Sequence, residues 1–421
     1  MSKYDFLLFK NNFKVSSYNV AYFLNKVFSE FCYSDYSVFT KRELDSIISA
    51  NDYLYFVKRT EKISSNFIVN VINTLMKLVD SKKIGVTYDY YLKYLQLNIN
   101  KYNIDNYDVI LLDEAQDTNT VTLAIINSIK SRKVIVGDSH QQIYGFRGSF
   151  NAMNKIKEDS LRYLTHSFRF TSDIALKATK FLRMFKAEKM DIVGLKELED
   201  IKTEAYIART NSGLIQLIAK FKDTDFALNR SVNDIFSGPI DMLNFMSFIK
   251  TKDQSYSSYI KNKFLLEFKT LKELTDYLKE TNDVELSAAF KLAMKFGGTI
   301  FELRKIAATK VSKKSRLTLT TAHSAKGLEW DKVTIIMDFR NLLELISKDS
   351  IFSIDTLHSV LSRGLDLKSI QELNLFYVAI TRAKYNLNIL SGNGKYIDLD
   401  FKSINESLLQ FRSTELSDVS K

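Results

Sequence analysis

The chain has 421 residues, 45% of them hydrophobic, so it is long and apolar enough for two or more domains with buried cores. Its 60 basic and 49 acidic residues give a formal net charge of +11, which favours a polyanion such as nucleic acid as a partner. A lysine-rich composition from an AT-rich genome explains the same charge equally well.

Membrane and secretion signals are not found in the sequence. It has no signal peptide and no apolar run of about 18 residues, so we expect no membrane span. Cys32 is the only cysteine, which excludes an intrachain disulfide and a zinc cluster of cysteines. We expect a cytoplasmic location, in a bacterium or in the host cell of a virus.

Helical periodicity is typical of residues 21–84, after a short apolar segment at residues 4–9. Two helix faces are formed by Tyr22, Phe23, Val27, Phe28 and Phe31 and by Phe67, Val69, Val71, Ile72, Leu75 and Leu78. A further helix is predicted over 86–97, before a loop around Asp105 and Asn106. Core packing is the favoured role of these aromatic side chains, and DNA contact is the alternative.

Two short apolar runs that end in acids follow. Residues 109–112 end in Asp113 and Glu114, and residues 134–136 end in Gly137 and Asp138, with an amphipathic helix predicted between them over 118–130. Such runs are typical of buried parallel strands, and ligands bind beyond the carboxyl ends of these strands. A carboxylate there can hold magnesium, and a neighbouring glutamate can orient or deprotonate an attacking water.

The same stretch carries a family resemblance. Two segments resemble motifs II and III of the UvrD/Rep-type superfamily 1 DNA helicases: Asp113-Glu114-Ala115-Gln116-Asp117 and VGDSHQQIYGFRG at 136–148. Their residues are most similar to those of the F-box DNA helicase branch. The resemblance implies that Asp113 holds the metal and that Glu114 activates water. It also implies that Gln141 senses the γ-phosphate of ATP.

Motif III also implies a DNA site. Tyr144 and Phe146 align with aromatic residues that stack on DNA bases, and stacking suits single strands because every base has a π-face. Core packing is the alternative for both residues. Arg147 aligns with an arginine that links the DNA site to the acids of motif II.

Residues 164–170 resemble motif IV. Phe168 takes the adenine-stacking position, and Arg169 takes the position of an arginine that reaches the γ-phosphate across a cleft between domains. Thr171 or Ser172 is expected to cap a helix that begins at 173. A strand is expected at 205–208, followed by Arg209. This arginine is either a functional residue or a partner in a buried salt bridge, and the sequence supports both roles equally.

Residues 212–314 look mostly helical, with charged or basic runs over 250–279 and 291–314. By resemblance this segment is an insertion that can contact duplex DNA, and solvated helices are the favoured alternative. Motif V follows at 322–330, after a strand over Leu317–Thr321 and before one over 333–337. It implies that His323 and Ser324 lie near the DNA backbone, that Gly327 permits close approach, and that Glu329 contacts the nucleotide sugar. We expect the only tryptophan, Trp330, in the core.

Residues 372–384 resemble motif VI. The pattern places Phe376, Val378 and Ala379 on the inner face of a helix, and a strand is expected over 385–390. By resemblance Arg382 is the second arginine directed at the γ-phosphate. The tail after about 400 shows no assignable chemistry.

One family element is missing from the sequence. No G-x-x-x-x-G-K-[ST] occurs, and Gly394-Lys395-Tyr396, the nearest imitation, fits a turn after a strand. Residues 13–18 resemble the strand and turn that follow motif Ia, so the Walker A loop would lie upstream. Without that loop we expect weak or absent binding of ATP and Mg²⁺. A split or truncated gene is favoured over a protein that kept only DNA binding.

We therefore expect an α/β protein with two RecA-like parallel-sheet motor domains. The first, over 1–165, is truncated at its N-terminus and carries a helical insertion at about 21–84. The second, over 166–395, has an insertion at about 212–314, and 396–421 form a tail. The resemblance implies an ATP-dependent helicase or translocase, moving 3′ to 5′, that acts in DNA replication, recombination or repair. Its expected partners are single-stranded DNA, a single-/double-strand junction and a separate polypeptide carrying the Walker A segment. The alternative is an inactive remnant that binds single-stranded DNA or a partner.

Overall fold

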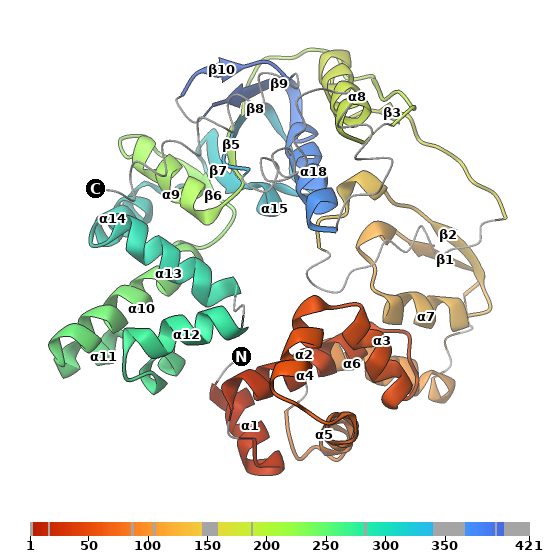
Figure 1. The fold of residues 1–421 in the computed structure, drawn as a ribbon. Coiled ribbons are helices and arrows are strands. Elements are labelled where there is room, and N and C mark those ends of the chain that lie inside the picture. Colours follow the sequence, from red (N-terminus) through yellow and green to blue (C-terminus); the bar gives the residue numbers. More distant parts are fainter. Residues whose placement is uncertain are drawn as a thin grey trace. The chain divides into compact units, whose positions relative to one another are not determined.

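The computed structural model describes residues 3–15, 17–85, 88–102, 104, 107–144, 159–186, 188–281, 284–339, 367–391 and 394–399 (Figure 1). Its contacts divide the chain into two compact units. Unit 1 comprises Met1–Ser139, Tyr144–Ile156 and Gly238–Lys295, and unit 2 comprises His140–Ile143, Lys157–Ser237 and Phe296–Lys421.

Unit 1 begins with helices, four of which start at a capping side chain. The helices are α1 (Lys3–Phe13), α2 (Tyr18–Tyr33), α3 (Lys41–Ser49), α4 (Asp52–Thr60), α5 (Ser65–Asp80) and α6 (Tyr88–Leu97), followed by the short 3₁₀ helix η1 (Ile99–Lys101). Ser17, Asn51 and Ser64 each accept a backbone N–H of the first turn of their helix. Thr40 and Glu43 form a reciprocal capping box at α3. These caps fix where the helices begin, so that their apolar faces meet in one core.

Two sequence predictions for this region are wrong in detail. The strand expected at 13–18 is not formed, because α1 continues to Phe13 and Lys14 then takes a left-handed turn with φ of 57°. In α5 the buried stripe runs through Ile68, Val71, Ile72, Leu75 and Val79. Phe67 falls outside this stripe and is exposed. Including the aromatic Phe67 therefore assigned the wrong face of α5 to the core.

The strand–helix–strand unit predicted around the acids is confirmed. Strands β1 (Val109–Leu112) and β2 (Arg132–Ile135) pair in parallel, with Leu111 opposite Val134, and α7 (Thr120–Ser128) connects them. The expectation that both strands are buried is wrong. Val109, Leu111, Val134 and Val136 are exposed, and Leu111 reaches 75%. All four lie on one face of the pair, because side chains alternate along a strand.

The remaining part of unit 1 is helical, as predicted for the insertion. It contains most of α10 (Val232–Thr251), then α11 (Gln254–Tyr259), the 3₁₀ helix η6 (Lys263–Glu267), α12 (Leu271–Thr281) and α13 (Val284–Phe296). Their apolar side chains form a second core, which includes Phe245, Phe264 and Leu274. The buried carboxylate of Asp241 accepts the backbone N–H groups of Lys261 at 3.1 Å and Asn262 at 2.7 Å, which fixes the turn before η6.

Unit 2 is built on a six-stranded sheet with the order β10-β9-β8-β5-β7-β6. Its strands are β5 (Glu204–Ala208), β6 (Ala227–Leu228), β7 (Leu317–Thr321), β8 (Trp330–Ile336), β9 (Ala383–Leu390) and β10 (Tyr396–Ile397). All pair in parallel except β10, which returns antiparallel after a turn in which Gly394 has a φ of +80°. A mixed α/β fold with a parallel sheet is therefore confirmed. The predicted turn at Gly394 is confirmed as well.

Unit 2 also contains helices, and most of them contact this sheet. They are α8 (Ser172–Lys186), α9 (Asn211–Lys220), α14 (Thr299–Lys310), the short α15 (Ala322–Ala325) and α18 (Leu367–Ile380), and a separate two-stranded ladder joins β3 (His166–Ser167) to β4 (Val193–Gly194). The rings of Phe181 in α8 and Phe376 in α18 lie 5.2 Å apart between centroids. Phe376, Val378 and Ala379 are fully buried, as predicted, but all residues from 372 to 380 are buried, so α18 has no single inner face there. Trp330 is also buried, and its Nε1 donates to Thr318 Oγ1 at 3.1 Å.

A buried aspartate beyond β8 fixes the start of α9. Asp338 Oδ1 accepts the N–H of Arg209 at 2.6 Å, and Asp338 Oδ2 accepts the N–H and Oγ1–H of Thr210 at 2.9 and 2.7 Å. Burial raises the pKa of Asp338 above its usual range, although these hydrogen bonds oppose the shift. Gly213 lies directly against this carboxylate, where an added Cβ would come within 2.2 Å of Asp338 Oδ2. Arg209 forms a salt bridge at 3.0 Å with the buried Glu372, which confirms the salt bridge predicted as one of its two alternative roles.

Lys93 of α6 is a fully buried lysine in the first core. Its Nζ donates to the backbone oxygens of Ser34 and Tyr36, both at 2.8 Å, and to Gln96 Oε1 at 2.6 Å. It also lies 4.5 Å from the centre of the Phe31 ring. Lys93 thereby fixes the loop after α2. Burial lowers the pKa of Lys93 to about 8.

In the part of the chain that the structure describes, no helix combines the length and the apolarity needed to cross a membrane.

Gly213→Ala is expected to lower the free energy of unfolding by about 3 kcal/mol, because the new methyl group displaces a buried, fully hydrogen-bonded carboxylate. Gly298→Ala is the matched control, since nothing lies within 4 Å of its Cβ position. The control should change stability by less than about 1 kcal/mol. Urea unfolding of both variants measures the difference, and equal midpoints would contradict the assigned role of Gly213.

Lys93→Met tests the buried lysine through its pH dependence. The ordinary lysine pKa of 10.5 applies to the unfolded chain, whereas the folded chain releases the proton above about pH 8. The unfolded state therefore binds more protons between these values, and raising the pH stabilises the fold. Relative to Lys93→Met, the wild type should gain up to about 3 kcal/mol from pH 8 to 10.5. Lys83→Met, at an exposed lysine, controls for removal of one charge. Parallel stability curves for wild type and Lys93→Met would exclude the effect.

Candidate functional site

The acids after β1 stand on an unusual backbone. Asp113 and Glu114 are both exposed, and Glu114 has a left-handed conformation with φ of 52°. Asp113 Oδ1 accepts the N–H of Glu114 at 2.8 Å, which stabilises this turn. A non-glycine residue with positive φ is uncommon, and such strain is concentrated at functional sites. Two neighbouring carboxylates are therefore exposed directly after the strand.

Gln116 ties the turn after β1 to the turn after β2. Its buried side chain donates from Nε2 to Glu114 Oε2 at 2.6 Å, and its Oε1 accepts the N–H of Asp138 at 3.0 Å. Gly137 is required at this crossing, because a Cβ there would lie 2.6 Å from Gln116 Oε1. Gln116 was not predicted as a site residue. Its role depends on the parallel pairing of β1 and β2, which brings the two turns together.

The segment 140–143 belongs to unit 2 and is held by the elements of motifs V and VI. Lys326 Nζ donates to the backbone oxygen of Gln141 at 3.0 Å, and Asn374 Nδ2 of α18 donates to that of Gln142 at 2.8 Å. His140 Nε2 lies 3.0 Å from Glu188 Oε2, and its ring meets the edge of Tyr377 at 6.0 Å between centroids. Motif III is therefore anchored to two segments that lie far from it in sequence.

Arg382 is the central charge of this group and is only 1% exposed. Its Nε donates to the backbone oxygen of Val378 at 2.8 Å, and its Nη1 donates to that of Leu328 at 3.3 Å. Its Nη2 donates to Thr381 Oγ1 at 2.9 Å and to Gln141 Oε1 at 3.4 Å. These four uncharged oxygens fix the orientation of the guanidinium. Gln141 and Arg382, predicted separately from motifs III and VI, are brought into contact.

Arg169 has a different environment from Arg382. Its Nε lies 3.2 Å from Glu329 Oε2, so these two predicted nucleotide-binding residues form an ion pair with each other. Lys384 Nζ joins them, at 3.2 Å from Glu329 Oε1 and 3.7 Å from Asp331 Oδ1. Burial would lower the pKa of Lys384, but the carboxylates of Glu329 and Asp331 raise it above the ordinary lysine value. Arg169 and Glu329 are partly exposed, so their pair can exchange partners.

Other predicted residues occupy varied positions. Phe168 is 78% exposed, so its ring is accessible, and Gly327 has a φ of +82° that suits glycine. His323 and Ser324 are half-buried at the short helix α15, where Ser324 N donates to Thr321 Oγ1 at 3.4 Å. Tyr144 is half-buried. The predicted DNA contacts Phe146 and Arg147 lie outside the described residues.

Three side chains of the site in unit 2 were missed by the sequence analysis. Lys326, Asn374 and Lys384 each hold another site residue or its backbone. Lys326 precedes Gly327 in motif V and Lys384 ends motif VI, so proximity to a motif was their only signal. Asn374 is buried within an apolar helix, and a buried polar side chain there needs partners. Such partners become visible only in three dimensions.

The donor groups fit part of a magnesium nucleotide site. Asp113 offers an exposed carboxylate oxygen of the kind that Mg²⁺ accepts together with phosphate oxygens. Gln141, Arg169 and Arg382 offer N–H groups that suit phosphate oxygens. The lysine and backbone nest of a Walker A loop are absent from the sequence. Asp113 of unit 1 and the two arginines of unit 2 therefore each suit one component of a magnesium nucleotide, and the sequence lacks the Walker A loop.

Comparisons with known proteins place most of the chain beside a helicase family. A model of the UvrD-like helicase C-terminal domain matches residues 31–393. F-box DNA helicase 1 of Gallus gallus is 30% identical over 336 residues, which cover 73% of this chain and 31% of that protein. F-box DNA helicase protein 1 of Schizosaccharomyces pombe is 30% identical over 328 residues, which cover 71% of this chain and 35% of that protein.

A further relative is the probable DNA helicase II homolog of Mycoplasma pneumoniae, which is 44% identical over 82 residues, or 20% of this chain and 10% of that protein. The chain spans about a third of the length of the two F-box helicases it matches. The match over residues 31–393 and the identity to both F-box helicases confirm the resemblance of the motifs. The chain belongs to the UvrD-like helicase family, of the UvrD/Rep type in superfamily 1.

Proposed function

We propose that this chain is the larger part of an ATP-dependent DNA translocase or helicase, moving 3′ to 5′ on single-stranded DNA, which acts in replication, recombination or repair. In this proposal residues 1–165 belong to the first RecA-like motor domain and 166–395 to the second, each with its helical insertion. The ATP phosphates are cradled by a loop that lies outside residues 1–421. Direction of movement and the two-motor arrangement rest on family membership.

One observation carries the proposal: the contact of Gln141 with Arg382. Gln141 follows the strand of motif III, and Arg382 follows the helix of motif VI. Lys326 of motif V holds the backbone of the same glutamine. A residue that senses phosphate can affect DNA binding only if it is mechanically connected to DNA-contacting segments. This set of hydrogen bonds supports such a connection, because it joins motifs III, V and VI directly.

The proposed chemistry assigns one task to each charged group. Asp113 binds Mg²⁺ and Glu114 orients or deprotonates the attacking water, since both are exposed at the end of a strand. When bound, ATP supplies the phosphoryl group whose transfer drives the motor. Arg382 donates N–H groups toward the phosphate from a preset position. Arg169 leaves Glu329 to do the same, at a cost of about 0–1 kcal/mol for an exposed ion pair. Phe168 stacks on the adenine, and Gly327 lies close to the nucleotide.

On the DNA side, we assign single-strand contacts to Tyr144, Phe146, Arg147, His323 and Ser324. The aromatic rings stack on bases and the polar groups bind the backbone. A single-/double-strand junction is the proposed substrate of the complete motor. The three names given to its relatives, F-box DNA helicase 1, F-box DNA helicase protein 1 and DNA helicase II homolog, support DNA as the polymer.

The supply of the phosphate loop from outside the sequence is supported by the β1–β2 pair. Parallel strands are normally covered on both faces, and a two-stranded sheet is marginal by itself. Here Val109, Leu111, Val134 and Val136 leave an apolar face exposed. Further chain that carries the Walker A loop would cover this face, either as a preceding segment or as a separate polypeptide. A reading frame for such a loop directly upstream of the gene would favour a split motor.

The second candidate function is a helicase remnant that binds single-stranded DNA, or a partner, without turnover. The missing Walker A sequence and the net charge of +11 favour it. It differs from the first proposal in one respect that can be measured. A remnant gains no ATPase activity from any added loop, whereas a split motor does.

The chain by itself should show DNA-stimulated ATPase activity near background, because nothing in it neutralises and cradles the phosphates. Release of phosphate in the presence of oligo-dT measures this, with binding of labelled oligo-dT as proof of a folded protein. Glu114→Gln tests any activity that is found, and Glu285→Gln, at an exposed glutamate of α13, is its control. Robust turnover that only Glu114→Gln abolishes would refute the need for an outside loop.

Arg382→Ala should destabilise unit 2 by about 3 kcal/mol or more, because four oxygens lose their buried donor. Its affinity for oligo-dT should remain within about threefold of wild type wherever the variant is folded, as expected of a nucleotide-site residue. Fluorescence anisotropy below the unfolding temperature measures this affinity, and Arg382→Lys controls for charge. If folded Arg382→Ala no longer binds DNA, Arg382 must be reassigned to the DNA site.

A further inference from the structure

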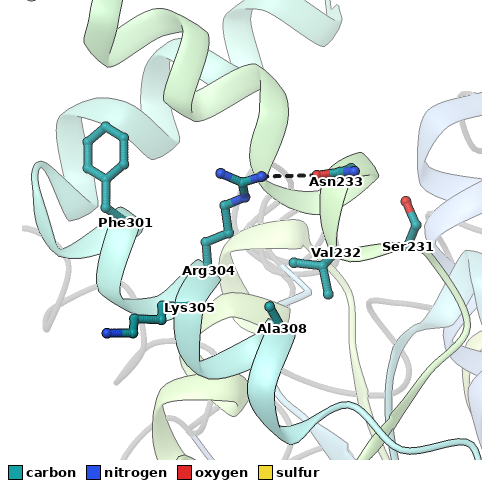
Figure 2. A pocket seen from close by; sticks show the side chains of 7 residues that line it. All are labelled: Ser231, Val232, Asn233, Phe301, Arg304, Lys305 and Ala308. Carbon is teal, nitrogen blue, oxygen red and sulfur yellow. Dashed lines mark hydrogen bonds between the residues drawn. The ribbon is translucent and has the colours of Figure 1, made fainter. Parts of the chain in front are cut away.

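A recess in unit 2 lies outside every motif discussed above. It has a volume of about 440 Å³ and is formed between the start of α10 and one face of α14 (Figure 2). That volume falls in the range of about 300–1,000 Å³ typical of ligand sites. The apolar floor comes from Val232 and Ala308. Ser231 and Asn233 contribute polar groups at its rim.

The α14 side of the recess carries an aromatic ring and two cations. Phe301, Arg304 and Lys305 are spaced three and four residues apart, so they share one helix face (Figure 2). All three are exposed, Phe301 to 44%. Figure 2 shows Arg304 reaching from α14 toward the start of α10, where its Nη2 donates to Asn233 Oδ1 at 3.2 Å. This hydrogen bond orients the guanidinium at the recess.

The local charge is strongly positive. Residues 299–316 contain six basic residues and one acidic residue. Besides Arg304, two of the six have structural partners: Lys310 pairs with Asp225 at 3.8 Å, and Arg316 donates to the backbone oxygens of Ile201 and Lys202. Within the described ranges, Arg304 and Lys305 form no ion pair with a carboxylate. The exposed acids Glu302 and Asp234 lie on the same two helices but do not line the recess.

We propose that this recess binds one nucleotide of single-stranded DNA, with a base on Phe301 and backbone phosphates on Arg304 and Lys305. Exposed aromatic rings beside cations are the combination that binds single strands independently of sequence. A duplex does not fit the ring, because its bases are stacked on one another. The cations are complementary in charge to the phosphates. The inference rests on the proposed function only for the choice of DNA as the polymer.

The test uses the full chain and labelled oligo-dT of about 20 nucleotides, longer than the usual site of about 4–16 nucleotides per module. The double variant Arg304→Gln/Lys305→Gln should weaken binding about tenfold. It should also reduce the slope of log affinity against log salt by about 1.4, which corresponds to two phosphates. Lys313→Gln/Lys314→Gln removes the same charge beyond the recess and should cost less than about threefold.

Stacking is tested separately at Phe301. Phe301→Ala should weaken binding about fivefold, and Phe301→Leu should do the same, because it keeps the apolar bulk and loses the ring. Recovery of binding in Phe301→Leu would show packing instead of stacking and overturn the base site. Thermal unfolding of each variant confirms that the chain remains folded.

The outcomes separate this inference from the proposed function. Equal losses in the two double-glutamine variants would overturn the recess as a site and leave the proposed function intact. Equal competition by a blunt duplex, sensitive to the same residues, would overturn the single strand as its occupant. A wild-type chain that binds no oligo-dT would overturn both.

Discussion

The hydrogen bonds of Gln141 and Gln142 connect motif III to motifs V and VI within unit 2. Any mechanical coupling between these motifs depends on them. The carbonyl oxygen of Gln141 is held by Lys326, and its side chain meets a guanidinium that two backbone oxygens have already fixed in place. The neighbouring Gln142 is tied to α18 through Asn374, which in turn accepts a hydrogen bond from Lys186 of α8. A displacement of Gln141 would therefore shift the hydrogen-bonded groups in α18, in the loop before β8 and in α8. Networks of this kind respond as a unit because each member is held by more than one partner.

Burial separates acids with similar places in the sequence. Asp113 and Asp338 both follow a short apolar strand closely. Asp338 is buried, and backbone and side-chain donors from the start of α9 occupy both of its oxygens, so it acts as a structural cap. Asp113 gives one oxygen to the turn and remains exposed. Only the second arrangement leaves a carboxylate that can reach a cation, and the sequence around the two residues does not distinguish them.

Local patterns explain what the sequence could predict. β1 was predicted from a continuous apolar run and the helix of motif VI from its apolar positions, and both signals lie in consecutive residues. The strand after Arg382 was expected as the one that completes the sheet. The buried environment of Lys93, the steric need for Gly213 and the contact of Gln141 with Arg382 join residues far apart in the chain. The left-handed Glu114 and the exposed face of β1 and β2 had no sequence signal, since the residue types alone favour the opposite. Membership of 238–295 in the same unit as 1–139 also depends on tertiary contacts.

The two arginines predicted for one task are prepared for it differently. Arg382 is buried, and it donates to the backbone oxygens of Val378 and Leu328, which hold its guanidinium in one orientation. Arg169 is partly exposed and neutralised by Glu329, so it must exchange one carboxylate for another anion. In the proposed function, Lys384 would remain beside Glu329 and compensate its charge when Arg169 exchanges partners. In the proposed function, the fixed Arg382 would set where an anion binds, whereas the exchangeable Arg169 would respond to its arrival.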